Sequence, residues 1–210
     1  MRIFTYTVGP VQSNAYLAAD LDSGTAVVID PGWDGELLLS DAKKLGVRIS
    51  EVWLTHAHFD HIGGLAALAN GLSSAPNIAL HPDDQALYNL QGGAPLFGMK
   101  IDTPPIPSMV LFHGQKLTLG ESTFEVRHTP GHTKGHVVFY CEKEAVAFVG
   151  DVIFLGSIGR TDLPGGDYST LIESISTQIL TMSDQTRLLT GHGPETSVGD
   201  ERVNNPFLLN

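Results

Sequence analysis

The stretch Thr55-His56-Ala57-His58-Phe59-Asp60-His61 places three histidines and an aspartate within six positions. One apolar run precedes it and a second follows, so it lies where a predicted strand ends and a helix begins. If the backbone is extended from His56 to His58, both imidazoles point to one side, whereas Asp60 and His61 on the turn reach a neighbouring point. We therefore expect this stretch to supply ligands to two adjacent metal ions. A hydrophilic surface loop is the alternative interpretation, which such a density of the commonest metal-ligand type disfavours.

The composition is typical of a single folded domain. The chain has 210 residues, of which 42% are hydrophobic and 17% are charged. This length suits one domain with a substantial core, and no apolar stretch approaches the roughly 20 residues that cross a bilayer. We therefore expect residues 1–210 to form one domain that acts without a membrane.

The charge balance indicates which partners to expect, and the cysteine content indicates the cellular compartment. Lys and Arg number 12 against 23 Asp and Glu, a net charge of −11, and no basic run offsets this excess. Nucleic acid is therefore not an expected partner. Cys141 is the single cysteine, which excludes an internal disulfide, and the first residues lack the pattern of a secretory signal. We expect a cytoplasmic protein.

Local patterns predict alternating strands and helices in the first half of the chain and a second group of strands after Leu111. Alternation and turn residues bound the strands, and helical spacing of apolar residues indicates the helices. The expected strands are Ile3–Val8, Asn14–Ala19, Thr25–Ile29, Ile49–Leu54, Ile78–Leu80, Lys116–Leu119, Thr123–His128, Val137–Cys141, Ala145–Val149 and Thr186–Thr190. The expected helices cover residues 37–45, 62–70 and 168–182, with another beginning near Pro82.

A long irregular loop is expected from Gln91 to Ser108, where the sequence contains three glycines and four prolines. Loops of this length in compact domains often cover a binding site. We expect Leu96, Phe97 or Met99 to form part of a lid over the site. The alternative is that these side chains only pin the loop to the core.

Three later patches contain further candidate ligands, and each follows a predicted strand at a glycine. They hold His132, Asp151 and His192. Strand ends let residues that are distant in sequence converge on a rigid frame. With the opening stretch they give five histidines and two aspartates, enough donors for two divalent ions with positions left for water. His136 is expected to support these ligands and not to bind metal itself.

The chain resembles the metallo-β-lactamase superfamily through motifs that run from Asp30-Pro31-Gly32 to Gly191-His192-Gly193-Pro194. This resemblance implies an α/β fold, a four-layered αββα sandwich. The segment Ser157-Ile158-Gly159-Arg160-Thr161-Asp162-Leu163-Pro164-Gly165-Gly166-Asp167 is similar to the small glyoxalase II-like, or hydroxyacylglutathione hydrolase, branch. Glyoxalase II proper has a C-terminal helical extension, which the 18 residues after His192 are not expected to supply.

The resemblance also implies a ligand set with two parts and a bridge. Two divalent ions are expected, with zinc first and with iron or manganese as alternatives. No cysteine stands at a ligand position, which argues against the β-lactam-hydrolysing members that use one. The implied ligands are His56, His58 and His132 for the first ion and Asp60, His61 and His192 for the second, with Asp151 bridging the two.

Two adjacent cations favour hydrolysis of a thioester. They lower the pKa of a shared water from about 15.7 towards roughly 7, so hydroxide is available at neutral pH. Attack on a thioester carbonyl releases a thiolate, which needs little protonation because thiols have a pKa near ~8.5. We therefore expect a small-molecule thioester as substrate, Asp60 and Asp151 as catalytic residues and ligands, and a monomer or homodimer.

Arg160 is the candidate substrate contact, because a guanidinium suits bidentate binding of a carboxylate on the thiol carrier. Glyoxalase II holds glutathione through Lys and Tyr contacts that fall near Arg160 and Asp162 here, so only the positive charge is matched. The alternative is an internal ion pair of Arg160 with Asp162 or Asp167.

Two other activities on this scaffold stay open. A persulfide dioxygenase would bind a single iron through His56, His132 and Asp151, and the number of metal ions separates it from a hydrolase. A metallo-ribonuclease is disfavoured by the acidic balance of the chain.

Overall fold

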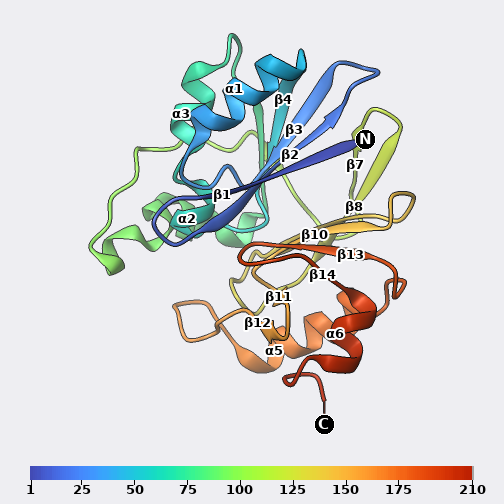
Figure 1. Cartoon of the computed structure of the whole chain (residues 1–210). Coiled ribbons are helices and arrows are strands. Elements are labelled where there is room, and N and C mark those ends of the chain that lie inside the picture. Colours follow the sequence, from blue (N-terminus) through green and yellow to red (C-terminus); the bar gives the residue numbers. More distant parts are fainter. Residues whose placement is uncertain (210) are drawn as a thin grey trace.

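The computed structural model describes residues 1–209, whose elements stack as helices, sheet, sheet and helices (Figure 1). The first sheet has the order β1-β2-β3-β4-β5-β6, with β1 to β3 antiparallel and β3 to β6 parallel. Its strands are β1 Arg2–Val8, β2 Ser13–Asp20, β3 Thr25–Ile29, β4 Arg48–Trp53, β5 Asn77–Leu80 and β6 Met109–Val110.

The second sheet has the order β14-β13-β10-β9-β8-β7, and only its β10 and β13 are parallel. A two-stranded hairpin, β11 Ile153–Phe154 with β12 Ser157–Ile158, lies beside it. The strands of the sheet are β7 Lys116–Leu119, β8 Ser122–His128, β9 Val137–Cys141, β10 Val146–Gly150, β13 Arg187–Thr190 and β14 Thr196–Ser197.

Helices cover the outer face of each sheet. Figure 1 shows α1 and α3 above the first sheet and α5 and α6 below the second. The helices are α1 Gly35–Leu45, α2 Phe59–Ile62, α3 Leu65–Gly71, α4 Gln85–Asn89, α5 Tyr168–Ser174 and α6 Val198–Asn204, with 3₁₀ turns η1 Pro82–Asp84 and η2 Gln91–Phe97 and a π-helical turn η3 Ile175–Ile179. Within residues 1–209, no helix combines the length and the apolar character needed to cross a membrane.

Three apolar clusters fill the spaces between these layers, as a four-layered sandwich requires. The middle cluster lies between the sheets, where the Trp53 ring packs 5.2 Å from Phe124 and 5.4 Å from Phe139. All three side chains are buried. Burial of each side chain stabilises the fold by roughly 1.5–3 kcal/mol. The order of helices, sheet, sheet and helices confirms the expected αββα sandwich.

The expected strands are confirmed with ends shifted by at most one residue, and the helix expected over residues 62–70 is confirmed from Leu65 onward but not at its start. It is divided into α2 and α3 at Gly63 and Gly64. The Gly64 N–H donates to Gly32 O at 2.6 Å, and a side chain at Gly64 would collide with the backbone of Gly35. The chain breaks here because another backbone segment packs directly against it.

Two further expectations about helices need correction. The helix expected from Tyr168 to Met182 is α5 followed by the π-helical turn η3, in which Leu180 N–H donates to Ile175 O at 2.9 Å. The tail contains α6, which the apolar pattern did not predict. Its signal is polar, because Ser197 Oγ accepts the Asp200 N–H at 3.1 Å as an N-cap.

The C-terminal ends of β3, β4, β10 and β13 meet at one edge of the sandwich. Parallel neighbours end at the same edge of a sheet, and two contacts join the sheets there. Asn14 N–H donates to Gly191 O at 2.7 Å, and Val137 N–H donates to Thr55 O at 2.8 Å. The histidine stretch after β4 and the glycine-rich turns of the second sheet therefore face each other.

Candidate metal centre

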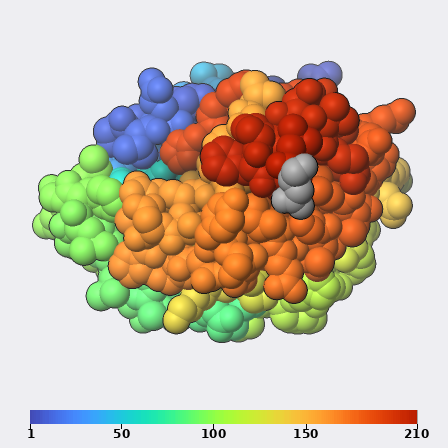
Figure 2. Space-filling view, turned by 90° about the horizontal axis from the view of Figure 1, so that it is seen from below, coloured from blue at the N-terminus to red at the C-terminus, as the bar shows by residue number. Residues whose placement is uncertain are grey.

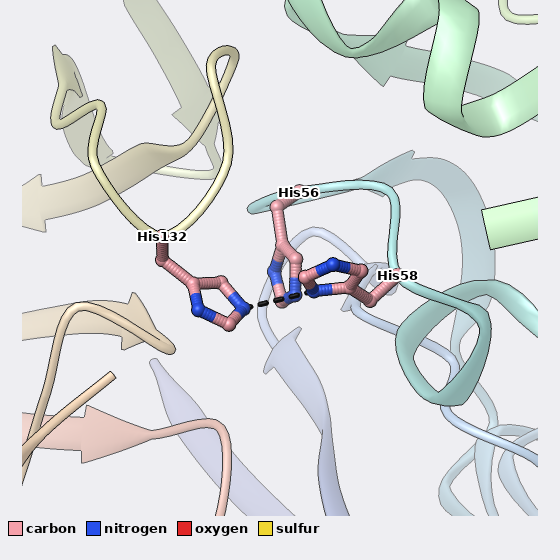
Figure 3. A group of neighbouring side chains, drawn as sticks. All are labelled: His56, His58 and His132. Atoms are coloured by element: carbon pink, nitrogen blue, oxygen red, sulfur yellow. Dashed lines mark hydrogen bonds between the residues drawn. The ribbon is translucent and has the colours of Figure 1, made fainter. Parts of the chain in front are cut away.

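Three histidines from two loops form the first group of possible ligands. His56 and His58 follow β4, and His132 lies on the loop between β8 and β9 (Figure 3). His58 Nδ1 lies 2.8 Å from His132 Nε2, and all three rings are buried. These nitrogens are close enough together to bind one ion.

The second group consists of Asp60 and His61 on α2 and of His192, which follows β13. Asp60 Oδ2 lies 3.1 Å from His192 Nε2 and 3.5 Å from His61 Nε2. Backbone contacts position this group, since Ser13 Oγ donates to Asp60 O at 2.7 Å.

Asp151 lies between the two groups, directly after β10. Its Oδ2 is 3.5 Å from His132 Nε2 in the first group, and its Oδ1 is 3.3 Å from His61 Nε2 in the second. The structure thus brings all seven predicted ligands to one place, with Asp151 between the two groups.

Hydrogen bonds fix which nitrogen four of the five ligand histidines present. The outer nitrogen of three rings faces a carbonyl or carboxylate oxygen, which can only accept, so Nδ1 carries the proton and Nε2 keeps a lone pair for the site. These pairs are His132 Nδ1 with Arg160 O at 2.7 Å, His61 Nδ1 with Asp30 Oδ2 at 3.0 Å and His192 Nδ1 with Gln12 O at 3.2 Å.

His56 is fixed in the same way through Thr55. The Thr55 hydroxyl donates its proton to Asp30 Oδ2 at 2.6 Å, so its oxygen accepts from His56 Nδ1 at 3.0 Å. Burial, and after it the charge of neighbouring His61, holds the pKa of His56 well below its ordinary value. His58 has a pKa of about 3, again because of burial and then of His132. Both rings are therefore neutral, as metal ligands must be.

The carboxylates of the site are charged. Burial alone would raise the pKa of Asp151, but His61 and His132 outweigh it and hold that pKa well below its ordinary value. Burial likewise disfavours charge on His61, yet the carboxylates of Asp151 and Asp60 raise its pKa well above the ordinary value. The two carboxylates therefore favour positive charge at this point, which bound cations would supply.

The donor set fits divalent cations. His56 Nε2, His61 Nε2 and Asp151 Oδ1 are buried and have no hydrogen-bond partner. A buried polar atom without a partner costs about 1–3 kcal/mol, and three such atoms converge here. Imidazole and carboxylate donors suit zinc, iron and manganese, so bound cations would satisfy all three atoms.

Asp84 is a buried carboxylate that the sequence reasoning missed. Its Oδ2 accepts from Ala57 N–H at 3.0 Å and from Thr133 Oγ1 at 2.8 Å, and its Oδ1 accepts from Gly135 N–H at 2.7 Å. Burial raises its pKa even though these donors oppose the shift. Asp84 thus ties the segment of His56 and His58 to the loop of His132.

Asp30 positions the second ligand group by accepting hydrogen bonds, as Asp84 does for the first. Its place in the Asp-Pro-Gly motif did not predict this role. Its carboxylate accepts from Thr55 N–H at 2.7 Å as well as from Thr55 Oγ1 and His61 Nδ1. The residue is buried and has a positive φ of 47°, an uncommon conformation for a residue with a side chain. Asp30, His56 and His61 are close enough together to hold an ion, but the Asp30 carboxylate is already engaged by these three donors, so we assign it to positioning the ligands.

Arg160 forms the internal ion pair that was one of its two interpretations. Its Nε and Nη2 each lie 2.8 Å from the Asp162 carboxylate, while Asp167 caps α5 by accepting Thr170 N–H at 2.8 Å. The Arg160 side chain also lines the cavity over the metal ligands. Contact with a substrate carboxylate therefore stays a prediction.

The cavity over the ligands has a volume of about 210 Å³. Phe97 and Met99 of the expected lid line it together with Leu163, and Phe97 packs 5.3 Å from the Phe59 ring. Two of the three expected lid residues, Phe97 and Met99, thus lie at the site, while opening and closing of the loop stays a prediction.

The family follows from sequence comparison. The family model of the metallo-beta-lactamase superfamily matches residues 8–192, a range that includes every residue of both ligand groups. The chain belongs to the metallo-β-lactamase superfamily. Members of this superfamily share the sandwich described above, so the resemblance in the sequence is confirmed.

Individual members of the superfamily match nearly the whole chain. Hydroxyacylglutathione hydrolase GloC from Haemophilus influenzae is 38% identical over 209 residues, which cover 99% of this chain and 98% of the relative. The structure of BLEG-1 B3 metallo-beta-lactamase is 41% identical with a TM-score of 0.92, and covers 100% of both chains. TTHA1623 in a di-iron-bound form is 42% identical with a TM-score of 0.89, over 98% of this chain and 100% of that one.

Proposed function

We propose that this protein is a binuclear metal-dependent thioesterase of the hydroxyacylglutathione hydrolase type. The observation that carries the proposal is the position of Asp151, whose carboxylate lies within 3.5 Å of His132 in the first ligand group and within 3.3 Å of His61 in the second. The similarity to GloC over almost the full length of both chains supports the thioester as substrate. His56, His58 and His132 would hold one cation and Asp60, His61 and His192 the other. Asp151, which lies close to both groups, would contact both cations.

The residues of the site are arranged to keep a nucleophile between the two groups. Two bound divalent cations would supply hydroxide at neutral pH and stabilise negative charge on a carbonyl oxygen. Asp151 and Asp60 stay ionised, because neighbouring histidines outweigh the effect of burial and lower the pKa of both carboxyls. They can therefore accept a hydrogen bond from the attacking water and orient it.

The leaving group accounts for the choice of a thioester. A thiol has a pKa near ~8.5, so the sulfur departs as a thiolate without a strong acid. Among residues 1–209, the basic side chain that lines the cavity is Arg160, whose exposed guanidinium is paired with Asp162. Arg160 would then bind a carboxylate of the thiol carrier by exchanging partners, and Arg160→Ala would raise KM with little effect on kcat. Unchanged kinetics with a lowered melting temperature would leave Arg160 with only its loop-shaping role.

Hydrolysis of β-lactams is the second candidate, which the similarity to BLEG-1 favours. Opening a β-lactam releases an amine nitrogen, which is a poorer leaving group than a thiolate and gains more from a proton donor. Among the described residues that line the cavity, only the histidines could donate a proton near neutral pH, and these are already assigned as metal ligands. The thioester is therefore the better match.

One set of assays separates these activities. Protein loaded with zinc or with iron is tested for hydrolysis of S-lactoylglutathione, for opening of a chromogenic cephalosporin, and for oxygen uptake on glutathione persulfide. We expect the first reaction to dominate, and Asp151→Ala to reduce it by on the order of a hundredfold or more. His113→Gln changes an exposed histidine outside the site and is the matched control. Oxygen uptake by protein with one iron per chain would instead identify the dioxygenase.

A further inference from the structure

A second cavity of about 300 Å³ opens beside the ligand cavity, between the segment of α4 and η2 and the loop before α5. Figure 2 shows the green segment that contains η2 next to the orange segment that leads into α5. The lining is apolar and includes Leu87, Leu90, Leu96, Phe97, Leu163 and Pro164. Within residues 1–209, no charged side chain lines this cavity, and its one titratable neighbour is His58.

The two cavities lie side by side and share part of their lining. His58, Phe97 and Leu163 line both of them, so a molecule whose reacting atom lies at the ligands can extend past His58 into the apolar space. Leu90 and Leu96 are 68% and 70% exposed. Covering such exposed apolar side chains with an apolar ligand removes them from water and therefore favours binding.

The wall of the apolar cavity is held in place by the histidine stretch itself. Gly92 has a positive φ of 62°, and its backbone lies so close to Phe59 N and Ala57 O that a side chain there would overlap them. Phe97 packs against Phe59 from the same wall. The position of the cavity is therefore coupled to the residues that carry His58 and Asp60.

We propose that this cavity is the acyl-chain site, and that the preferred substrates are thioesters of apolar acyl groups longer than a lactoyl or acetyl group. The inference rests on the proposed thioesterase function. A volume of about 300 Å³ equals roughly ten water molecules at ~30 Å³ each, which is more space than a lactoyl or acetyl group fills.

The chemistry of the two cavities assigns the two ends of the substrate. A polar thiol carrier gains nothing from a lining of leucine and proline, since buried polar groups need partners. The exposed Arg160 and Asp162 pair at the ligand cavity offers charged partners instead. In the reaction, the oxygen of water bonds to the acyl carbon and the C–S bond breaks. One proton of the water goes to the leaving sulfur and the other to solvent, so the products are a carboxylate, whose chain leaves the apolar cavity, and a free thiol.

The test compares S-acetyl-, S-butyryl- and S-hexanoylglutathione with the metal-loaded protein. We expect kcat/KM to rise roughly fourfold for each added methylene, the factor that corresponds to about 0.8 kcal/mol per buried CH₂. The double variant Leu90→Ser/Leu96→Ser should lose at least tenfold more kcat/KM on the hexanoyl than on the acetyl thioester. Leu21→Ser is the matched control, because Leu21 is 40% exposed and follows β2 at the end away from the ligands.

A binding measurement on the metal-free protein gives an independent readout. Hexanoate should bind more tightly than acetate in an NMR titration, and Leu90→Ser/Leu96→Ser should abolish the difference while Leu21→Ser preserves it. Hydrolysis of all three thioesters at one rate, with no preference for hexanoate, would overturn the acyl-chain site and leave the thioesterase intact. Hydrolysis of none of them would contradict the proposed function and, with it, the assignment of the cavity to an acyl chain.

Discussion

His136 Nε2 accepts a hydrogen bond from the backbone N–H of Asp151 at 3.1 Å. An acceptor nitrogen carries no proton, so the proton of this ring is on Nδ1, which donates to Thr129 Oγ1 at 3.0 Å. His136 is fully buried, and burial holds its pKa well below the ordinary value. A neutral histidine outside the ligand groups thus positions the bridging carboxylate, which accords with the supporting role expected from the sequence.

Replacing His136 should weaken metal binding without removing a ligand. His136→Ala leaves the Asp151 N–H buried and without its acceptor, which costs about 1–3 kcal/mol of the free energy of unfolding. Loss of such a supporting contact lowers metal affinity about 10–100-fold. Titration of the metal-free variant with zinc, followed by calorimetry, measures this change. Wild-type affinity in a folded His136→Ala protein would show that the contact does not position Asp151.

Asp84→Asn should destabilise the fold and loosen both histidine segments. The amide nitrogen of asparagine cannot accept, so at least one of the donors from Ala57, Thr133 and Gly135 loses its partner. We expect a loss of about 2 kcal/mol in urea unfolding. Asp83→Asn is the control, because Asp83 is the exposed neighbour and its replacement should change stability by less than about 0.5 kcal/mol. Equal effects of the two substitutions would argue against a structural role for Asp84.

Substitution of Gly92 and of Gly98 separates two costs to stability: that of a left-handed backbone conformation and that of a clash with a neighbouring backbone. Both have a positive φ, 62° and 66°, but only Gly92 lies against another backbone. Gly98→Ala should cost about 1–2 kcal/mol, the penalty of the left-handed conformation. Gly92→Ala should cost about 3 kcal/mol or more and lower activity, because the loop must move away from the histidine stretch. Similar costs for both variants would mean that the loop is not anchored there.

Asp167 should give a stability difference that depends on pH. Hydrogen bonds from Thr170 N–H and then from Ser169 lower its pKa in the folded protein to about 2, below the ordinary 3.8. The stabilisation by its charge is therefore present above about pH 3.8 and is lost as the pH falls through about 2. Asp167→Asn keeps an N-cap of similar quality without the charge, so wild type and variant should differ more at pH 7 than at pH 3. A difference that stays constant in urea unfolding at both pH values would contradict the shift.

Most of the ligands could be predicted from the sequence because they come shortly after strands. His56, His132, Asp151 and His192 stand one to four residues after the ends of β4, β8, β10 and β13, and local pattern determines strands well. The break at Gly64 could not be predicted, since it depends on the backbone of Gly35, which a local pattern does not contain.

The supporting residues and the apolar cavity could not be predicted from the sequence for the same reason. Asp84 looked like an ordinary residue of a helix start, and its contacts with Thr133 and Gly135 span about fifty positions of sequence. Leu96 and Leu163 line one cavity although they come from different loops. Such sites arise from tertiary packing, so only the folded structure reveals them.

The central claim is that two cations and one bridging carboxylate form a hydrolytic site. The most direct test is the number of metal ions per chain in fully loaded protein, measured by inductively coupled plasma mass spectrometry on the same samples that are assayed with S-lactoylglutathione. The account predicts two ions in the wild type, one ion in His192→Gln, and loss of hydrolysis in that variant. One ion per chain in a fully active wild-type protein would contradict it.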